Sequence, residues 1–166
     1  MGPVQKFSIN YVPTEDRLAF DAEDAGGVTT RLWLTERLCR TVAPHLIKLV
    51  SERAAAKATG AVAPSTVQSW AQISALRGFG ESPAVRLATD APSGLVTTVH
   101  ITPVNGRFQI KFEFGERSLG LDLDEGALRQ TLTLLARLYQ VAGWPGELWP
   151  DWVLDPVPEP AVRTVN

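Results

Sequence analysis

Cysteine, histidine and methionine are scarce in this chain of 166 residues, which has one cysteine, two histidines and one methionine. The single Cys39 excludes a disulfide within the chain. It lies among the apolar positions of a predicted helix, so we expect a buried, unreactive thiol in a reducing compartment. His45 and His100 are far apart in the sequence, and a zinc site would need several carboxylates beside them. We therefore predict no metal site and no cysteine-based active site.

Motifs for phosphate, calcium or a catalytic serine are also missing. The segment Gly78-Phe79-Gly80 lacks a third glycine at the spacing of a dinucleotide loop, and the chain has no Gly-x-Ser-x-Gly elbow. The acidic loop at 21–27 has Leu32 where an EF-hand needs its closing glutamate, so we interpret it as a solvated hairpin loop. We predict no catalytic residues and no cofactor.

Long apolar runs and a strong excess of one charge are absent as well. No stretch approaches the ~20 apolar residues of a membrane span, and residues 1–6 lack the apolar core of a signal peptide. The formal net charge of −2 argues against a protein whose main task is binding polyanions. We expect one domain over residues 1–166, soluble and cytoplasmic, with no membrane partner.

Residues from about 6 to 58 have the pattern of three strands followed by a helix. Apolar residues alternate with polar ones at Phe7 and Ile9, at Leu18, and again at 30–34. Thr35 is a suitable N-cap for the helix that follows. Pro44 lies inside this helix and predicts either a kink or a division into two helices.

Residues from about 94 to 143 repeat that order. Two strand patterns flank a hairpin turn over 103–106, and a third strand pattern reaches residue 123. Asp124 is the expected N-cap of the helix that follows, and Gly143 ends this helix. Turn positions, alternation and caps agree between the two segments. We therefore predict an α+β fold of two duplicated strand–strand–strand–helix units with pseudo-twofold symmetry, in which antiparallel sheets pack against helices.

A connecting helix and a tail complete the prediction. The helix spans about 64–78, with Ser65 as its expected cap and Val67, Trp70, Ile73 and Leu76 at helical spacing. Residues 144–166 are rich in tryptophan and proline and are typical of an extended tail. Its indoles either fold back onto the core or dock a partner protein, which makes three tryptophans docking candidates: Trp144, Trp149 and Trp152.

The polar faces of the strands are the second candidate surface. If the helices cover one side of a sheet, the other side displays cationic and aromatic residues: Arg31, Trp33, His100, Arg107 and Lys111. Cations beside an aromatic ring are typical of platforms for single-stranded nucleic acid. The order of the units resembles that of the Whirly and PUR-type single-strand binders, which have four strands per unit. A solvated face of mixed charge is the alternative interpretation.

These patterns favour a non-enzymatic interaction or adaptor module whose partner, another protein, uses the open sheet face or the tail. Binding of single-stranded nucleic acid on the open face is the alternative function. An enzyme with its site between the two units is a third possibility, because clefts between structural units are favoured ligand sites. The sequence leaves the oligomeric state open.

Overall fold

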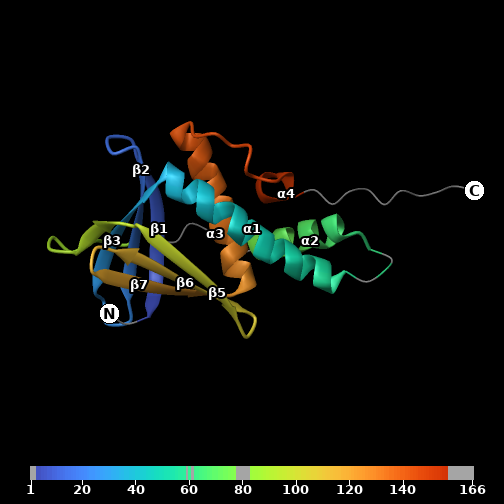
Figure 1. The fold of residues 1–166 in the computed structure, drawn as a ribbon, viewed down its shortest axis with the longest axis horizontal. Helices are drawn as coiled ribbons and strands as arrows, with labels where there is room; N and C mark the ends of the chain where they lie inside the picture. Colours follow the sequence, from blue (N-terminus) through green and yellow to red (C-terminus); the bar gives the residue numbers. More distant parts are fainter. Residues whose placement is uncertain (1–2, 59, 61, 78–82, 157–166) are drawn as a thin grey trace, which may run out of the picture.

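The computed structural model describes residues 3–58, 60, 62–77 and 83–156, and it combines β-sheets and helices in an α+β fold (Figure 1). The helices are Glu36–Lys57 (α1), Pro64–Leu76 (α2), Glu125–Ala142 (α3) and Asp151–Leu154 (α4). The strands are Val4–Val12 (β1), Arg17–Asp24 (β2), Thr29–Thr35 (β3), Ser93–Leu95 (β4), Thr98–Val104 (β5), Arg107–Phe114 (β6) and Arg117–Leu123 (β7). Each half has the predicted three strands and helix. Internal duplication and pseudo-twofold symmetry stay predictions.

The first sheet has the strand order β1-β2-β3-β4. Its first three strands pair antiparallel, whereas β4 pairs parallel with β3. The inner face of β2 carries Leu18 and Phe20, and its outer face carries Ala19 and Asp21; all four are buried. Residues are buried on both sides of a strand only when both faces of the sheet are covered there. Another segment must therefore cover part of the outer face of this sheet.

The second sheet contains β5, β6 and β7, all antiparallel. Asn105 and Gly106 join β5 to β6 with φ values of 48° and 82°, as a two-residue hairpin turn requires. Pro103 lies in β5, at the edge of the sheet, where its missing N–H is tolerated. Along β6, the buried residues alternate with polar ones and form the inward face: Phe108, Ile110, Phe112 and Phe114.

The core lies between the two sheets and helices α1 and α3. Phe20 of the first sheet contacts Phe112 of the second, with ring centroids 5.3 Å apart. Leu46 of α1 and Leu132 of α3 belong to the same buried cluster. An apolar cavity of about 50 Å³ remains among these elements, and buried Cys39 is one of its lining residues.

The predicted ends of the long helices are confirmed. Thr35 Oγ1 accepts a hydrogen bond from the Leu38 N–H at 3.2 Å, and Asp124 Oδ1 accepts one from the Ala127 N–H at 2.8 Å. Gly143 ends α3 with a left-handed φ of 68°. Helix α1 continues through Pro44, so the predicted alternative of a division into two helices is wrong at this point.

Helix α2 joins the fold through polar side chains. Arg129 of α3 is 1% exposed, and its guanidinium donates to Glu125 Oε1 at 3.0 Å and to Gln68 Oε1 at 2.8 Å. Gln72 Nε2 donates to Thr133 Oγ1 at 2.8 Å. Buried polar groups are costly unless they are hydrogen-bonded, and these groups bond to one another across α2 and α3. We call these five side chains the polar network.

Two expectations for the connections are corrected. Ala63, not Ser65, is the N-cap of α2, because Pro64 fits the first helical position, where no N–H is needed. The tail is not wholly extended, since Asp151–Leu154 form the short helix α4, with Val153 fully buried. Among the described helices, none is long and apolar enough to cross a membrane.

Candidate functional site

The predicted sheet-face residues lie on two different sheets. Arg31 and Trp33 are on β3, whereas the other three are on β5 and β6. Arg31 Nε and Nη2 each donate to Asp21 at 2.7 Å, and these hydrogen bonds raise the pKa of Arg31. The Arg31 Cζ lies 5.2 Å from the centroid of the Trp33 ring. Arg31 is therefore held between a buried carboxylate and an indole.

The predicted cations of the second sheet are paired as well. Arg107 Nε donates to Asp122 at 2.7 Å, and Lys111 Nζ donates to Glu113 at 3.0 Å. His100 Nε2 lies 3.2 Å from the same Glu113 carboxylate. The hydrogen bond from Lys111 is the main reason that the pKa of Glu113 is lowered. The structure thus places each predicted basic residue of this sheet beside an acidic side chain.

The tail tryptophans lie against the protein's own core. Trp149 is 6% exposed, and Trp144 and Trp152 are partly buried against the same cluster. Trp144 Nε1 donates to Asp16 Oδ1 at 2.9 Å, and Trp149 packs edge-on to Tyr139 with centroids 5.2 Å apart. This arrangement matches the alternative in which the tail folds back.

The open edge of the first sheet is the strongest candidate site. The backbone of β4 bonds β3 through alternate residues: the Arg31 N–H donates to the Pro92 carbonyl at 2.9 Å, and the Val96 N–H donates to the Trp33 carbonyl at 3.0 Å. In a parallel ladder of this register, the N–H and C=O groups of Ser93 and Leu95 point away from β3. Within the part of the chain that the structure describes, no further strand pairs with them, and they form a short free edge.

A cleft of about 590 Å³ lies along this edge. The β6–β7 turn forms its opposite wall, and its lining residues are Ser93, Gly94, Leu95, Thr97, Phe114, Gly115, Glu116 and Arg117. A cleft of this volume is within the range of ligand pockets in proteins. The β4 edge and this turn together leave room for an added chain segment.

Gly94 packs tightly against the side chain of Phe114, and both residues line the cleft. A Cβ at this position would lie 2.7 Å from Cδ2 of Phe114, closer than such atoms approach. The Phe114 ring is 3% exposed and packs directly against the Gly94 backbone. The absence of a side chain at Gly94 is therefore a requirement of the packing under β4.

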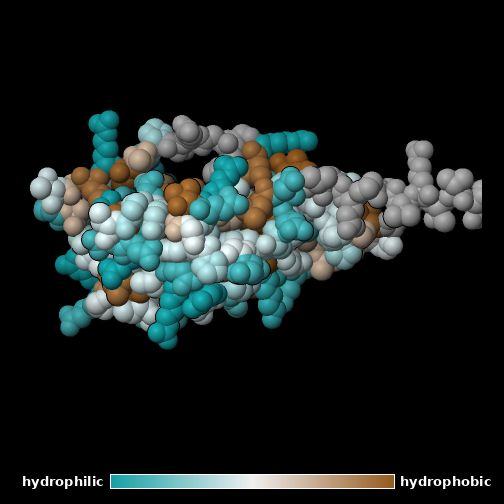
Figure 2. Space-filling model, turned by 90° about the horizontal axis from the view of Figure 1, so that it is seen from above, coloured by the Kyte–Doolittle hydropathy of each residue, from teal (hydrophilic) through white to brown (hydrophobic). Residues whose placement is uncertain are grey.

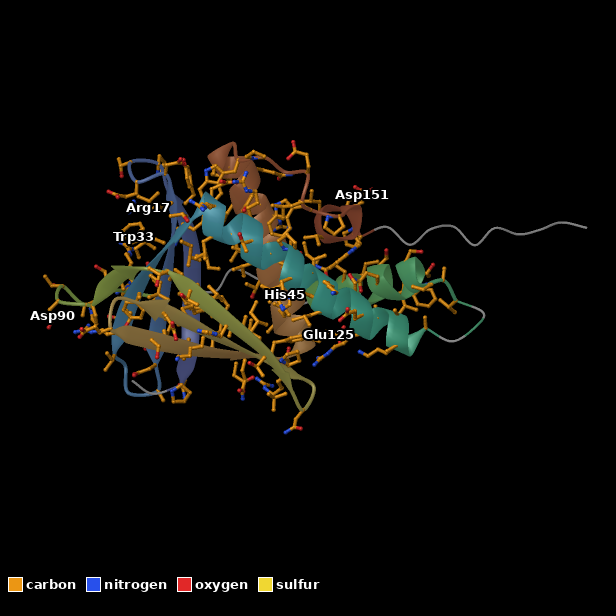
Figure 3. All side chains as sticks on the ribbon, viewed as in Figure 1. Arg17, Trp33, His45, Asp90, Glu125 and Asp151 are labelled. Atoms are coloured by element: carbon orange, nitrogen blue, oxygen red, sulfur yellow. The ribbon has the colours of Figure 1, made fainter. Side chains whose placement is uncertain are left out.

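An apolar pair lies on the outer face beside the free edge. Trp33 and Leu95 are partners in the β3–β4 register, so their side chains point to the same side of the sheet. Leu95 is 42% exposed and Trp33 is half-buried. Figure 3 shows Trp33 on the strand side of the molecule, away from Glu125 and Asp151 among the helices. This pair offers an apolar contact beside unpaired backbone groups.

The segment leading into β4 covers another part of the outer face. The Val85 N–H donates to Ser8 Oγ at 3.2 Å, and the Ala88 N–H donates to Thr29 Oγ1 at 3.0 Å. These bonds tie residues 83–88 to β1 and β3. They explain the burial of β2 on its outer side and leave the Trp33–Leu95 end open.

The cleft has few polar side chains. Its polar side chains are two hydroxyls, Ser93 and Thr97, and two charged groups, Glu116 and Arg117. Among the described residues, no histidine, cysteine or lysine lines it to activate a hydroxyl. Within the described ranges, no group of three or more His, Cys, Asp or Glu side chains could hold a metal ion. On the face seen in Figure 2, hydrophobic patches are separated by hydrophilic side chains.

The sequence patterns name Trp33 and Arg31 but not the edge itself. Three residues are too few for strand alternation to be recognised, and Pro92-Ser93-Gly94 is typical of a turn. The one signal is Leu95, an apolar residue directly after this polar, glycine-containing segment. Its pairing with Trp33 depends on a contact between residues distant in sequence.

Comparisons of the chain with protein-family models, with curated proteins and with solved structures found no match. The function must therefore be argued from the geometry of the β4 edge.

Proposed function

We propose that this protein is a non-enzymatic interaction module that binds an extended peptide segment of another protein along β4. The observation that carries the proposal is the free edge of Ser93 and Leu95 above an open cleft. Strand addition to an exposed sheet edge is a recurring mode of peptide recognition, in which backbone hydrogen bonds supply affinity and side-chain contacts supply specificity.

The contacts predict which peptides fit. An added strand places alternate side chains on the outer face, next to Leu95 and Trp33, where an apolar residue buries the exposed Leu95 surface. Glu116 and Arg117 at the opposite wall can meet charged residues of either sign. The edge offers two residues' backbone groups, and each hydrogen bond contributes about 0.5–1.5 kcal/mol, so we expect micromolar or weaker binding.

Binding of single-stranded nucleic acid stays the alternative. It receives less support because the cations predicted for it lie on two sheets and each has an acidic neighbour. Such platforms need cations free to meet phosphates.

Two further proposals concern the origin and setting of the chain. The matching element order of the two halves supports duplication of a strand–strand–strand–helix unit. The buried, unpaired Cys39 supports a reducing, cytoplasmic setting.

The test begins with a random peptide library selected on the immobilised full chain. An enriched peptide is synthesised, and its affinity is measured by fluorescence anisotropy for the wild type, Ser93→Pro and Ser93→Ala. Proline removes an outward-pointing N–H without touching a bond to β3, so we expect about two- to tenfold weaker binding. Alanine keeps the N–H and should change the affinity by less than about twofold.

Hydrogen exchange locates the bound peptide. We expect slower exchange at the Ser93 and Leu95 amides in the complex. The proposal fails if no peptide binds saturably, if protection falls elsewhere, or if both Ser93 variants bind alike. A gel shift with single-stranded DNA and RNA at low salt tests the alternative function in parallel.

A further inference from the structure

Helix α2 has polar residues on its buried side, and its larger apolar residues are half-buried or exposed. The buried residues of this helix are Gln68, Ser69 and Gln72, and the glutamines belong to the polar network. On the opposite side, Trp70 is 54% exposed. The apolar residues of α2 with helical spacing, Val67, Trp70, Ile73 and Leu76, do not belong to the buried core cluster or to the residues packed against it. An ordinary surface helix buries its apolar residues in the core, whereas here Trp70 is exposed and the other three are half-buried.

Helix α2 also carries no charge. Its sequence from Pro64 to Leu76 contains no Asp, Glu, Lys or Arg. The centre of a protein–protein interface is depleted of charged residues and enriched in tryptophan, and exposed tryptophans are frequent binding hot spots. The exposed side of α2, which we call the α2 face, therefore has the composition of an interface. It lies at the far end of the molecule from β4 (Figure 1).

The order of residues on the α2 face makes it complementary to itself. Trp70 is the central residue of α2. If two copies of α2 cross antiparallel on a twofold axis through Trp70, Val67 of each copy meets Ile73 of the other. The same patch then serves on both sides, as a twofold interface requires. If a helix face carried charged residues, a twofold pairing would often place two like charges together. The α2 face carries no charged residue, so pairing two copies causes no such repulsion.

We propose that the α2 face is a homodimer interface in which two copies of this chain pair antiparallel through Val67, Trp70 and Ile73. This inference is independent of the peptide site. Thirteen helical residues extend about 20 Å, and one helix pair of that length buries less than the ~1,200 Å² of a standard interface. The dimer is therefore weak, with a dissociation constant on the order of 100 µM.

Sedimentation velocity over about 10 µM to 1 mM full-length protein tests this proposal. We expect a reversible, concentration-dependent shift from monomer to dimer. Trp70→Lys should abolish it, because two ammonium groups would then meet on the axis. Val141→Lys is the matched control: Val141 is 71% exposed on α3 and lies outside the α2 face, so its dimerisation should equal that of the wild type. Circular dichroism confirms that each variant is folded.

A complementary pair of variants tests the register. Val67→Lys alone and Ile73→Glu alone should each be monomeric. An equimolar mixture should form a heterodimer, because the introduced lysine of one chain meets the introduced glutamate of the other, while the native Ile73 and Val67 meet across the second contact. Monomer up to about 1 mM for the wild type, a dimer that survives Trp70→Lys, or a mixture that stays monomeric would each overturn the proposal.

Discussion

Replacing Arg129 by methionine tests the polar network that holds α2 in place. Methionine keeps much of the length of the side chain and removes the guanidinium. Four contacts are lost: the hydrogen bonds to Glu125, Gln68 and Gln72, and the approach of the Arg129 Cζ to the Trp152 ring at 5.4 Å. Glu125 keeps its ion pair with Lys57 at 2.8 Å, so its carboxylate is not left alone.

The magnitude follows from what remains buried. Gln68 is 4% exposed and Gln72 is fully buried, and the amide oxygen of each faces Arg129, at 2.8 and 3.4 Å. A buried acceptor without a donor costs about 1–3 kcal/mol, and two such acceptors remain, whereas Glu125 stays paired with Lys57. We expect Arg129→Met to lower the free energy of unfolding by about 2–6 kcal/mol and Tm by roughly 4–24 °C.

Urea unfolding followed by circular dichroism and tryptophan fluorescence measures this loss. Arg137→Met is the matched control, because Arg137 is an exposed arginine on the same helix, and its variant should stay within about 0.5 kcal/mol of the wild type. The triple variant Gln68→Leu/Gln72→Leu/Arg129→Met should recover stability, since it leaves neither amide oxygen unpaired. Equal stability of the two methionine variants would refute the reasoning.

Three further predictions concern other parts of the fold. Burial alone raises the pKa of Glu125, but hydrogen bonds with its two basic partners outweigh burial and lower it. The ionised Glu125 carboxylate therefore stabilises the fold fully above the ordinary pKa near 4.5, and this stabilisation is lost as the pH falls below that value. Glu125→Gln should flatten the acid limb of a stability–pH curve, and an unchanged limb would contradict this prediction. Burial raises the pKa of Cys39 to about 12, so a thiol reagent at about pH 8 should label it only after unfolding; rapid native labelling would argue against this burial. Gly94→Ala pushes a Cβ against Phe114 and should cost about 1–3 kcal/mol in urea unfolding, whereas Gly120→Ala, with open space around it, should be near neutral; equal effects would count against the packing under β4.

Local signals explain why many elements are predictable from the sequence. Alternation along β6, the Asn105-Gly106 turn, and the N-caps Thr35 and Asp124 each depend on neighbouring residues. The same signals mark the end of α3 at Gly143. The predicted helix stop and caps agree with the structure because the chemistry that produces them lies within a few residues.

The candidate surfaces depend on contacts between distant residues. Helical spacing in α2 marks Val67, Trp70 and Ile73 as one face, but spacing alone does not say whether that face is buried. The buried side is instead the one that meets Arg129, because a guanidinium enclosed by the fold needs amide oxygens around it.

The sequence by itself determined the α+β class, the order of strands and helices in each half, the hairpin and the helix ends, because local periodicity and capping specify them. Tertiary structure alone decided that β4 pairs with β3 through one edge, that Phe114 packs against Gly94, and that α2 buries its glutamines and leaves Trp70 exposed. Those features follow from strand register and from the pairing of buried polar groups, and both bring together residues far apart along the chain.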